Sequence, residues 1–264
     1  MEHSINNRVS VITPSYNSSA FISQTIDSVL FQTYTDWEML IVDDCSTDDS
    51  ASIIKQYSKR DARIKYLKTD LPSGSPCEPR NIGIMSAQGR YIAFLDSDDV
   101  WLPNKLEEQL KLFEDADTAI VYSNYEKINE DGERGQRIVT VPPQVSYMEL
   151  LKGNVIGNLT GIYDTEKVGK VYCSKIHHED YVLWLSILKK GFVARNTNVV
   201  HALYRVRKQS VSANKLAVIS WQWNIYRNVE KMQLSGLVVF FFVFFIPTFL
   251  AIQFGSDFVN NVVA

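Results

Sequence analysis

Short apolar segments alternate with amphipathic segments along the first half of the chain. Runs rich in β-branched and other apolar residues occupy Val9–Thr13, Trp37–Val42, Ile64–Leu67 and Tyr91–Leu95. Each run is short enough to form one strand. After a candidate helix cap at Ser18 or Ser19, apolar residues recur at helical spacing at Phe21, Ile22, Ile26, Val29 and Leu30. The alternation of strands and helices predicts an α/β fold, with a mostly parallel central sheet flanked by helices on both faces.

Beyond Tyr122 the strict alternation is lost, and we expect a smaller mixed sheet. A strand is predicted at Ala119–Tyr122 and a hairpin or edge loop at Asn124–Gly135, which is polar and rich in turn-forming residues. An amphipathic helix is predicted at Tyr181–Lys189, ending at Gly191. No linker rich in Pro, Gly or Ser separates the two halves, so one folded unit is predicted up to about residue 215.

The segment 234–254 contains no charged residue and is apolar all around a helix. About 20 apolar residues are needed to cross a bilayer, and a proline such as Pro247 is tolerated there. Lys and Arg are more frequent before this segment than after it, which favours a cytoplasmic N-terminal part. We therefore expect residues 216–264 to form a helical membrane-associating segment that places the protein at the cytoplasmic face of the inner membrane. The alternative is a helix packed into an apolar groove of its own domain or of a partner.

The composition is that of a globular protein with a large core. Of the 264 residues, 45% are hydrophobic and 22% are charged. The net charge of −3 argues against a nucleic-acid partner bound through its phosphates. The three cysteines are widely spaced and form neither a disulfide framework nor a zinc motif, which indicates a reducing compartment. The polar start, Met1–Arg8, lacks the apolar core of a signal peptide.

Carboxylates gather directly after the apolar run Tyr91–Leu95, at Asp96, Asp98 and Asp99. Carboxylates this close raise one another's pKa unless a cation lies between them. Hard oxygen ligands at the end of a central strand suit Mg²⁺ or Mn²⁺. The alternative is an Asp-rich turn that caps the next helix, in whose first turn Pro103 can lie.

Two further strand ends carry polar groups, at Pro14–Tyr16 and at Asp43–Asp44. Ligands of parallel α/β sheets bind beyond the carboxyl ends of the strands, so these groups and Asp96–Asp98 are expected at one edge. The chain lacks the G-x-G-x-x-G pattern of dinucleotide-binding folds and the G-x-x-x-x-G-K-[ST] pattern of P-loop enzymes, which disfavours both classes. An aspartate at the second strand end can instead accept a hydrogen bond from a base or a ribose. A divalent ion at the fourth can hold a diphosphate.

Two stretches in the second half carry further candidate chemistry. Asp180 follows His177 and His178 at the start of the predicted helix, where it can act as a helix cap or as a general base near a bound diphosphate. The two histidines are adjacent rather than one helical turn apart, so we do not interpret them as a zinc pair. The basic stretch 203–212 can neutralise a leaving diphosphate or contact anionic lipid head groups.

Taken together, these stretches resemble family 2 glycosyltransferases, which are inverting enzymes with the GT-A fold. The resemblance runs from Val9 to about Ser212. It rests on these motifs, in chain order: Val9–Asn17, Ser28–Tyr34, Ile41–Asp44, Ser46–Asp48, Pro79–Gly83, Phe94–Asp99, Glu179–Asp180, Tyr204–Arg205, Ser210 and Ser212. It implies a GT-A domain at residues 1–215, with a Rossmann-like nucleotide-binding half at about 1–122 and an acceptor half at about 123–215.

The resemblance also implies roles for particular residues. Those expected to contact a nucleotide sugar are Pro14, Tyr16, Asp43, Asp44, Arg80, Asp96, Ser97, Asp98, Arg205 and Arg207. Asp98, supported by Asp96, is expected to bind Mn²⁺ or Mg²⁺, and Asp180 is expected to be the catalytic base. The expected acceptor contacts are Glu179, His178 and Trp184. Many relatives carry a histidine where this chain has Arg207, so either His201 is a substitute or Arg207 provides the charge directly.

The activity implied by the resemblance is the inverting transfer of a sugar from a UDP-sugar to a hydroxyl of a polyprenyl-diphosphate-linked saccharide, in the assembly of bacterial O-antigen, capsule or teichuronic-type polymers. The expected partners are the UDP-sugar, the lipid-linked acceptor and the cytoplasmic membrane surface. One alternative is transfer to polyprenyl phosphate itself. Another is a non-catalytic nucleotide-sugar-binding protein on the same fold, against which the intact Asp44, Asp98 and Asp180 argue.

Overall fold

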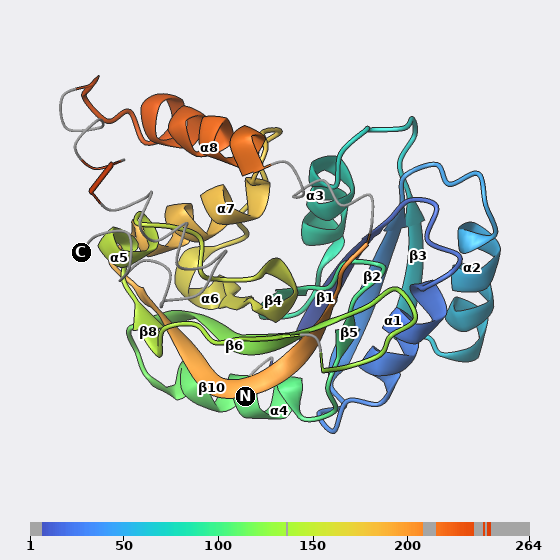
Figure 1. Cartoon of the computed structure of the whole chain (residues 1–264). Helices are drawn as coiled ribbons and strands as arrows, with labels where there is room; N and C mark the ends of the chain where they lie inside the picture. Colours follow the sequence, from blue (N-terminus) through green and yellow to red (C-terminus); the bar gives the residue numbers. More distant parts are fainter. Residues whose placement is uncertain (1–6, 136, 208–214, 235–239, 241, 244–264) are drawn as a thin grey trace.

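The computed structural model describes residues 7–135, 137–207, 215–234, 240, 242 and 243, which form a central sheet with helices on both faces (Figure 1). The first half contains β1 (Val9–Ser15), α1 (Ile22–Leu30), β2 (Trp37–Asp43), α2 (Ser50–Arg60), β3 (Ile64–Lys68), α3 (Cys77–Ser86), β4 (Tyr91–Phe94), β5 (Val100–Trp101) and α4 (Lys105–Lys111). The second half contains β6 (Thr118–Ile128), β7 (Arg137–Val139), β8 (Gln144–Val145), α5 (Tyr147–Leu150), β9 (Ile162–Asp164), α6 (Thr165–Val168), α7 (Glu179–Leu188), β10 (Val193–Arg205) and α8 (Lys215–Asn224). A π-helix at Ile225–Val229 follows α8.

The main strands of the sheet lie in the order β3-β2-β1-β4-β9-β6-β10-β5. The strands β3, β2, β1 and β4 are parallel, and Val11 of β1 pairs with Met39 on one side and Ala93 on the other. Every residue of β1, β2 and β4 is buried, which explains why their sequences are apolar runs rather than alternating patterns. The predicted α/β fold, with a parallel core built from these apolar runs, is confirmed.

The second half continues the same sheet and does not form the separate smaller sheet that the sequence predicted. β9 pairs antiparallel with β4 and with β6, so it joins the two halves. The predicted strand at Ala119–Tyr122 is longer, because β6 continues to Ile128 and pairs with β7. Of the two predicted alternatives for the polar stretch Asn124–Gly135, a hairpin or an edge loop, the hairpin is therefore the one observed.

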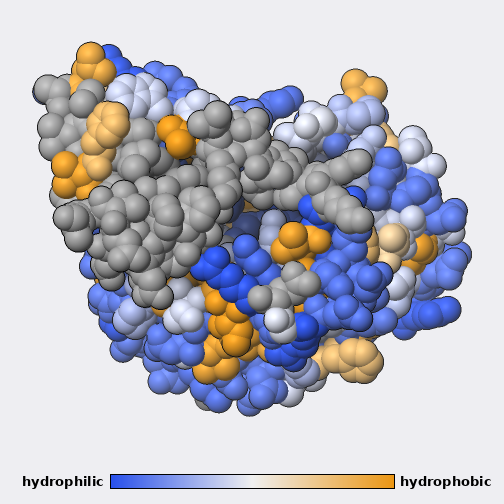
Figure 2. Space-filling model, in the orientation of Figure 1, coloured by the Kyte–Doolittle hydropathy of each residue, from blue (hydrophilic) through white to orange (hydrophobic). Residues whose placement is uncertain are grey.

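Alternate residues of the parallel strands point into two hydrophobic cores on opposite faces of the sheet. Val11 and Met39 pack in one core with α1, α2 and α4. Ile12 and Leu40 pack in the other, with α3 and α7. Hydrophilic side chains cover most of the surface over α1 and α2, as expected for helices that bury one side (Figure 2).

Helix α1 begins without the serine cap that the sequence predicted. The residue before the helix is Phe21, and no side chain caps this end. The hydroxyl of Ser18 instead lies 2.7 Å from that of Ser15 and so belongs to the loop after β1. The prediction of a cap at Ser18 or Ser19 is wrong, because the helix begins after Phe21 and the amides of Ser18 and Ser19 donate to Ser50 and Asp48 in the segment after β2.

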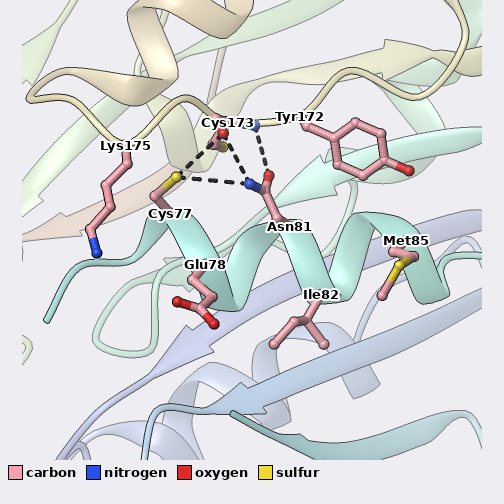
Figure 3. Close-up of a pocket in the computed structure, with 8 residues that line it drawn as sticks. All are labelled: Cys77, Glu78, Asn81, Ile82, Met85, Tyr172, Cys173 and Lys175. Atoms are coloured by element: carbon pink, nitrogen blue, oxygen red, sulfur yellow. Dashed lines mark hydrogen bonds between the residues drawn. The ribbon is translucent and has the colours of Figure 1, made fainter. Parts of the chain in front are cut away.

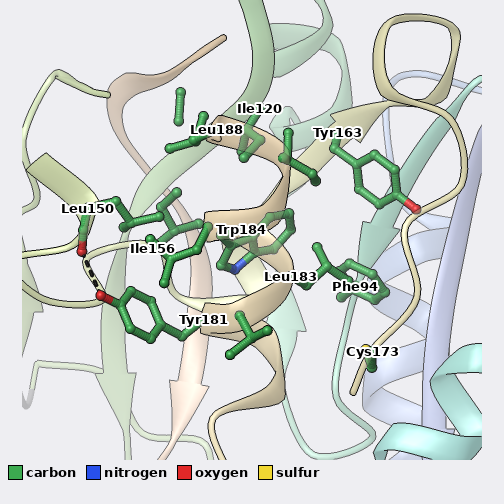
Figure 4. Packing of buried hydrophobic residues seen from close by; sticks show 14 of the residues in the cluster. Phe94, Ile120, Leu150, Ile156, Tyr163, Cys173, Tyr181, Leu183, Trp184 and Leu188 are labelled. Carbon is green, nitrogen blue, oxygen red and sulfur yellow. Dashed lines mark hydrogen bonds between the residues drawn. The ribbon is translucent and has the colours of Figure 1, made fainter. Parts of the chain in front are cut away.

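Helix α7 lies in the middle of the second core (Figure 4). The Trp184 ring is fully buried and packs edge-on against Phe94 and Tyr163, at centroid distances of 5.7 and 6.4 Å. Gly161 makes room for this ring, because a Cβ there would lie 2.5 Å from it. The helix predicted here is confirmed, but its amphipathic character is not. Almost every side chain from Tyr181 onward is buried.

The described start of the C-terminal segment packs against the rest of the domain, with Ile225 and Tyr226 fully buried in the core that contains α7. In the part of the chain that the structure describes, no helix is long and apolar enough to cross a membrane. This finding contradicts the predicted location at the cytoplasmic face of the inner membrane through a C-terminal apolar segment. Residues 235–239, 241 and 244–264, which include most of the predicted apolar helix 234–254, lie outside the described residues.

Candidate active site

The loops after the parallel strands meet at one edge of the sheet, as their polarity predicts. The loops after β1 and β2 are joined by the Ser19 amide, which donates to Asp48 Oδ2 at 3.0 Å. Pro14 is buried beneath this edge, whereas the Tyr16 side chain is 58% exposed. Tyr16 therefore presents an aromatic face to solvent at the rim of the site.

Asp43 and Asp44, at the end of β2, are buried and already hold neighbouring groups. The Tyr66 hydroxyl donates to Asp43 Oδ2 at 3.0 Å, and burial together with this contact raises the pKa of Tyr66 to about 12. Asp44 Oδ1 accepts from Thr69 Oγ1 and from the Ser73 amide, both at 2.9 Å, and Oδ2 accepts from Ser73 Oγ at 2.8 Å. A carboxylate oxygen can accept twice, so Asp44 Oδ2 keeps a position for one more donor.

The turn after β4 brings three carboxylates together. Burial raises the pKa of Asp98, and repulsion from Asp96 raises it further. The pKa of Asp99 is raised well above its ordinary value by burial and by both neighbouring carboxylates. Asp99 accepts from the Arg205 amide at 2.8 Å, while the residue before α4 is Asn104. The alternative that this turn caps the next helix is therefore wrong.

Arg205 lies beneath the acidic turn and is only 3% exposed. Its Nε donates to the Asp98 carbonyl and its Nη2 to Gln24 Oε1, both at 2.7 Å, and its Nη1 donates to the Glu130 carbonyl at 2.8 Å. The contact of Arg205 with a nucleotide sugar stays a prediction, and in this structure the buried guanidinium fixes the backbone of the turn.

Arg207 lies on the exposed side of the same turn. Its Nη1 is 3.4 Å from Asp98 Oδ2, and its side chain is 48% exposed. His201, the other candidate for this charge, is 2% exposed and faces Glu108 of α4 at 3.1 Å. Arg207 rather than His201 therefore lies beside the acidic turn. The predicted contributors Ser210 and Ser212 lie outside the described residues.

Arg80 connects the acidic turn to the start of α7. Its Nη2 lies 2.6 Å from Asp96 Oδ1, and its Nη1 pairs with Glu179. Burial lowers the pKa of Arg80, but the carboxylates of Asp96 and Glu179 more than offset this, and the net shift is upward. The predicted nucleotide contact Arg80 and the predicted acceptor contact Glu179 are thus paired with each other.

Other residues of the predicted motif Pro79–Gly83 hold α3 in place. A Cβ at Gly83 would lie 2.6 Å from Ile12 Cγ2, so glycine allows the helix to approach β1 closely. Asn81 donates to the Cys173 carbonyl at 2.9 Å and accepts from the Cys173 amide at 2.7 Å (Figure 3). The pocket of about 460 Å³ beside these residues contains none of the predicted site residues.

Asp180 lies in the first turn of α7. Burial is the main cause that raises its pKa to about 6, Glu179 raises it further, and Arg80 lowers it. Asn154 Nδ2 donates to Asp180 Oδ2 at 3.3 Å. The residue before the helix is His178, so Asp180 is not the helix cap. A partly buried carboxylate whose pKa approaches neutrality is suited to general base catalysis.

The two remaining predicted acceptor contacts lie in different places. His178 directly precedes Glu179 and is partly buried, which lowers the pKa of its imidazole. Trp184 lies inside the core and cannot contact an acceptor in this structure. The assignment of Trp184 is wrong because α7 is buried on nearly all sides, whereas the sequence suggested one exposed face.

Asp96 and Asp98 fit a divalent cation by the chemistry of their oxygens. A cation between them would relieve the repulsion that helps to raise the pKa of Asp98. Among the described residues, no group of three or more His, Cys, Asp and Glu side chains is arranged to hold a metal ion. The two carboxylates would therefore need further oxygens, such as those of a bound diphosphate, to complete the coordination shell.

Residues 10–170 match the family model described as glycosyl transferase family 2. The chain belongs to this family. Among relatives of this glycosyltransferase, TuaG of Bacillus subtilis (strain 168), whose name assigns it to teichuronic acid biosynthesis, is 41% identical over 225 residues, covering 85% of this chain and 89% of TuaG. WfgD of Escherichia coli, named a UDP-Glc:alpha-D-GlcNAc-diphosphoundecaprenol beta-1,3-glucosyltransferase, is 40% identical over 230 residues, covering 87% of this chain and 89% of WfgD.

Solved structures share the fold of this glycosyltransferase. S. aureus TarS 1-349 in complex with UDP-GlcNAc has a TM-score of 0.68 and 20% sequence identity, covering 94% of this chain and 72% of the TarS chain. The mannosyltransferase PcManGT from Pyrobaculum calidifontis, in complex with GDP-Man and Mn²⁺, has a TM-score of 0.65 and 17% identity, covering 86% of this chain and 65% of that one. The GT-A fold implied by the sequence motifs is confirmed.

Some residues of this glycosyltransferase that hydrogen-bond to the predicted site carboxylates were not predicted from the sequence. Thr69 and Ser73 hold Asp44, and Asn154 donates to Asp180. No sequence motif or regular spacing marks these hydroxyl and amide side chains as part of the site. The available signal for Ser73 was the Pro-, Gly- and Ser-rich loop that follows β3.

Proposed function

We propose that this family 2 glycosyltransferase transfers a sugar from a UDP-sugar to a hydroxyl of a polyprenyl-diphosphate-linked saccharide, with inversion at the anomeric carbon. The observation that carries the proposal is Asp180, whose pKa is raised to about 6 and which lies next to an ion-paired bridge from Glu179 through Arg80 to Asp96. The choice of substrates is supported by the names of two relatives, WfgD and WfaP of Escherichia coli. Both are 40% identical and are named for transfer from UDP-Glc to alpha-D-GlcNAc-diphosphoundecaprenol.

The donor would bind at the edge formed by the first half of the chain, about residues 1–122. Tyr16 offers an exposed aromatic face, and Asp44 Oδ2 can accept from the edge of a base. Asp98 and Asp96 would hold Mn²⁺ or Mg²⁺, which when bound would offset charge on the diphosphate. Arg207, exposed beside Asp98, adds a cation at the same place.

The acceptor would bind at the start of α7, in the half that spans about residues 123–215. Asp180 would take the proton from the acceptor hydroxyl. At the same time, the oxygen of that hydroxyl forms a bond to the anomeric carbon of the donor sugar. The bond from that carbon to the UDP oxygen breaks, and UDP leaves with the electron pair. A single displacement of this kind converts an α-linked donor into a β-linked product.

The test is a transfer assay with UDP-glucose as donor and a lipid analogue of GlcNAc α-linked to diphosphate as acceptor. We expect UDP release that requires both the acceptor and a divalent ion, and a β-linked product by NMR. Polyprenyl phosphate is the comparison acceptor. Transfer to polyprenyl phosphate with none to the GlcNAc-diphosphate lipid, or an α-linked product, would contradict the proposal.

A further inference from the structure

Helix α8 lies beside α7 (Figure 1), and the π-helix after it packs into the core that contains α7. This segment, Lys215–Glu230, is called the C-terminal brace below. Within it, Ile225 and Tyr226 are fully buried, and the Tyr226 hydroxyl donates to the Leu151 carbonyl. The brace is therefore part of the core around α7. It also lies outside residues 10–170, which match the family model.

The brace holds the end of α7. Glu230 Oε2 accepts from Lys189 Nζ at 2.6 Å, directly after the last residue of the helix. The same oxygen accepts from the Tyr147 hydroxyl of α5 at 2.5 Å. This carboxylate therefore ties the end of α7 to a second helix.

The start of α7 needs support because no side chain caps it. His178 precedes the helix with φ of 60°, a left-handed conformation that side-chain-bearing residues rarely adopt. The Trp221 ring of α8 stacks on the His177 ring, with a centroid distance of 4.2 Å and an interplanar angle of 12°. It also packs edge-on against the His178 ring at 5.3 Å. One indole thus contacts both residues of the turn that leads into α7.

This contact bears on Asp180, which lies in the first turn of the helix. A change in the backbone at His178 would move the start of α7 and, with it, the Asp180 carboxylate. We propose that the C-terminal brace fixes the start of α7 and that Trp221 is a positioning residue for Asp180, acting through His177 and His178. The inference rests on the proposed role of Asp180 as the base.

The first test follows the histidine rings by NMR and needs no substrate. The chain has four histidines, and a stacked indole shifts the ring protons of its partner upfield by its ring current. We expect Trp221→Ala to remove this shift from His177 and to move the His178 signals. The matched control is Asn224→Ala, at an exposed position of the same helix, which is expected to leave the two histidines unchanged. Unchanged signals in Trp221→Ala would overturn the contact.

The second test measures transfer with UDP-glucose and the GlcNAc-diphosphate lipid analogue. Displacing a catalytic group by about 1 Å can cost about a hundredfold in rate. We expect Trp221→Ala to lower kcat by about ten- to a hundredfold, with UDP affinity by calorimetry unchanged, and Trp221→Phe to recover most of kcat. His177→Ala, at an exposed position, removes the stacked partner with little risk to folding and should lower kcat in the same way.

The two proposals fail in different ways. Wild-type kcat in both Trp221→Ala and His177→Ala would overturn the positioning role even if Asp180 is the base. Full transfer by Asp180→Asn would show that Asp180 is not the base and would therefore also overturn the positioning role of Trp221. In that case the contact of Trp221 with His177 and His178, as observed by NMR, would only support the structure of α7.

Discussion

The guanidinium of Arg80 lies 2.6 Å from the carboxylate of Asp96. The same buried guanidinium pairs with Glu179, so one cation faces the acidic turn and the start of α7. Asp180 follows Glu179 and is affected by both charges, because Glu179 raises its pKa and Arg80 lowers it. The charges around Asp180 can therefore be changed one at a time.

Substitutions of the two charged neighbours should shift the pH dependence in opposite directions. As the proposed base, Asp180 must be deprotonated to act, so kcat/KM should fall as the pH drops below about 6 in the wild type. Glu179→Gln removes a negative charge and should move this fall to lower pH. Arg80→Met removes a positive charge and should move it to higher pH, in each case by about one unit. The measurement is kcat/KM from pH 4.5 to 9.

The control for these variants is Lys175→Met, which removes a cation five residues from Asp180 and outside its contacts. Its profile should follow the wild type. Arg80→Met leaves Asp96 and Glu179 without their partner, so folding is checked by circular dichroism, and Glu179→Gln carries the test if that variant unfolds. Shifts of the same sign in both variants would contradict the electrostatic account.

The protonation of Asp180 also predicts an effect on stability. Its pKa is about 6 in the folded protein and about 4 in an unfolded chain, so the folded state holds more protons between these values. The contribution of Asp180 to stability should therefore decrease as the pH rises from about 4 to about 6. Asp180→Asn removes this loss and should raise the free energy of unfolding at pH 7 by about 1–2 kcal/mol, after allowance for partial exposure. Urea denaturation at pH 7 and pH 4 measures it. An equal gain at both pH values would contradict the raised pKa.

The acidic turn predicts a metal-dependent loss of nucleotide binding. Asp98→Asn keeps the shape of the side chain but removes the charge that would hold a divalent ion. UDP affinity measured by calorimetry in Mn²⁺ should fall by about tenfold or more, while the weak binding in EDTA should change little. Asp70→Asn, at an exposed position, is the matched control. Unchanged Mn²⁺-dependent binding in Asp98→Asn would remove Asp98 as a ligand.

The two arginines at the end of β10 should respond differently to substitution. Arg205 makes several buried hydrogen bonds to the turn, which lysine cannot reproduce, so Arg205→Lys should lower the free energy of unfolding by about 2–4 kcal/mol. Arg207→Met, at an exposed position, should leave stability within about 0.5 kcal/mol but weaken UDP binding. Thermal unfolding and calorimetry separate the two effects. Equal loss of stability in both variants would be inconsistent with this division of roles.

The parallel half of the fold could be predicted from sequence because three of its four strands, β1, β2 and β4, are buried along their whole length. Val9–Ser15 and Trp37–Asp43 lie in the middle of the sheet, where continuous apolar runs are required. The second half was harder, since β9 is a short strand whose place between β4 and β6 depends on long-range pairing. No local pattern marks such a strand.

The site was predictable in its charges but not in their pairing. The motifs located Asp98, Asp180 and Arg80, yet a sequence does not reveal that Arg80 is held by two carboxylates or that Arg205 lies beneath the turn. Burial decides these roles, because a buried guanidinium must be paired with acceptors of its own protein. Burial also explains why Trp184 packs in the core, since its helix is surrounded by core residues on nearly all sides.

The central claim is that Asp180 takes the proton from the acceptor hydroxyl. The most direct test compares wild type and Asp180→Asn in the transfer of glucose from UDP-glucose to the GlcNAc-diphosphate lipid analogue, with UDP affinity measured on the same samples. In Asp180→Asn, kcat is expected to fall by about a thousandfold or more while UDP affinity stays within about twofold. Transfer by Asp180→Asn at the wild-type rate would contradict the central claim.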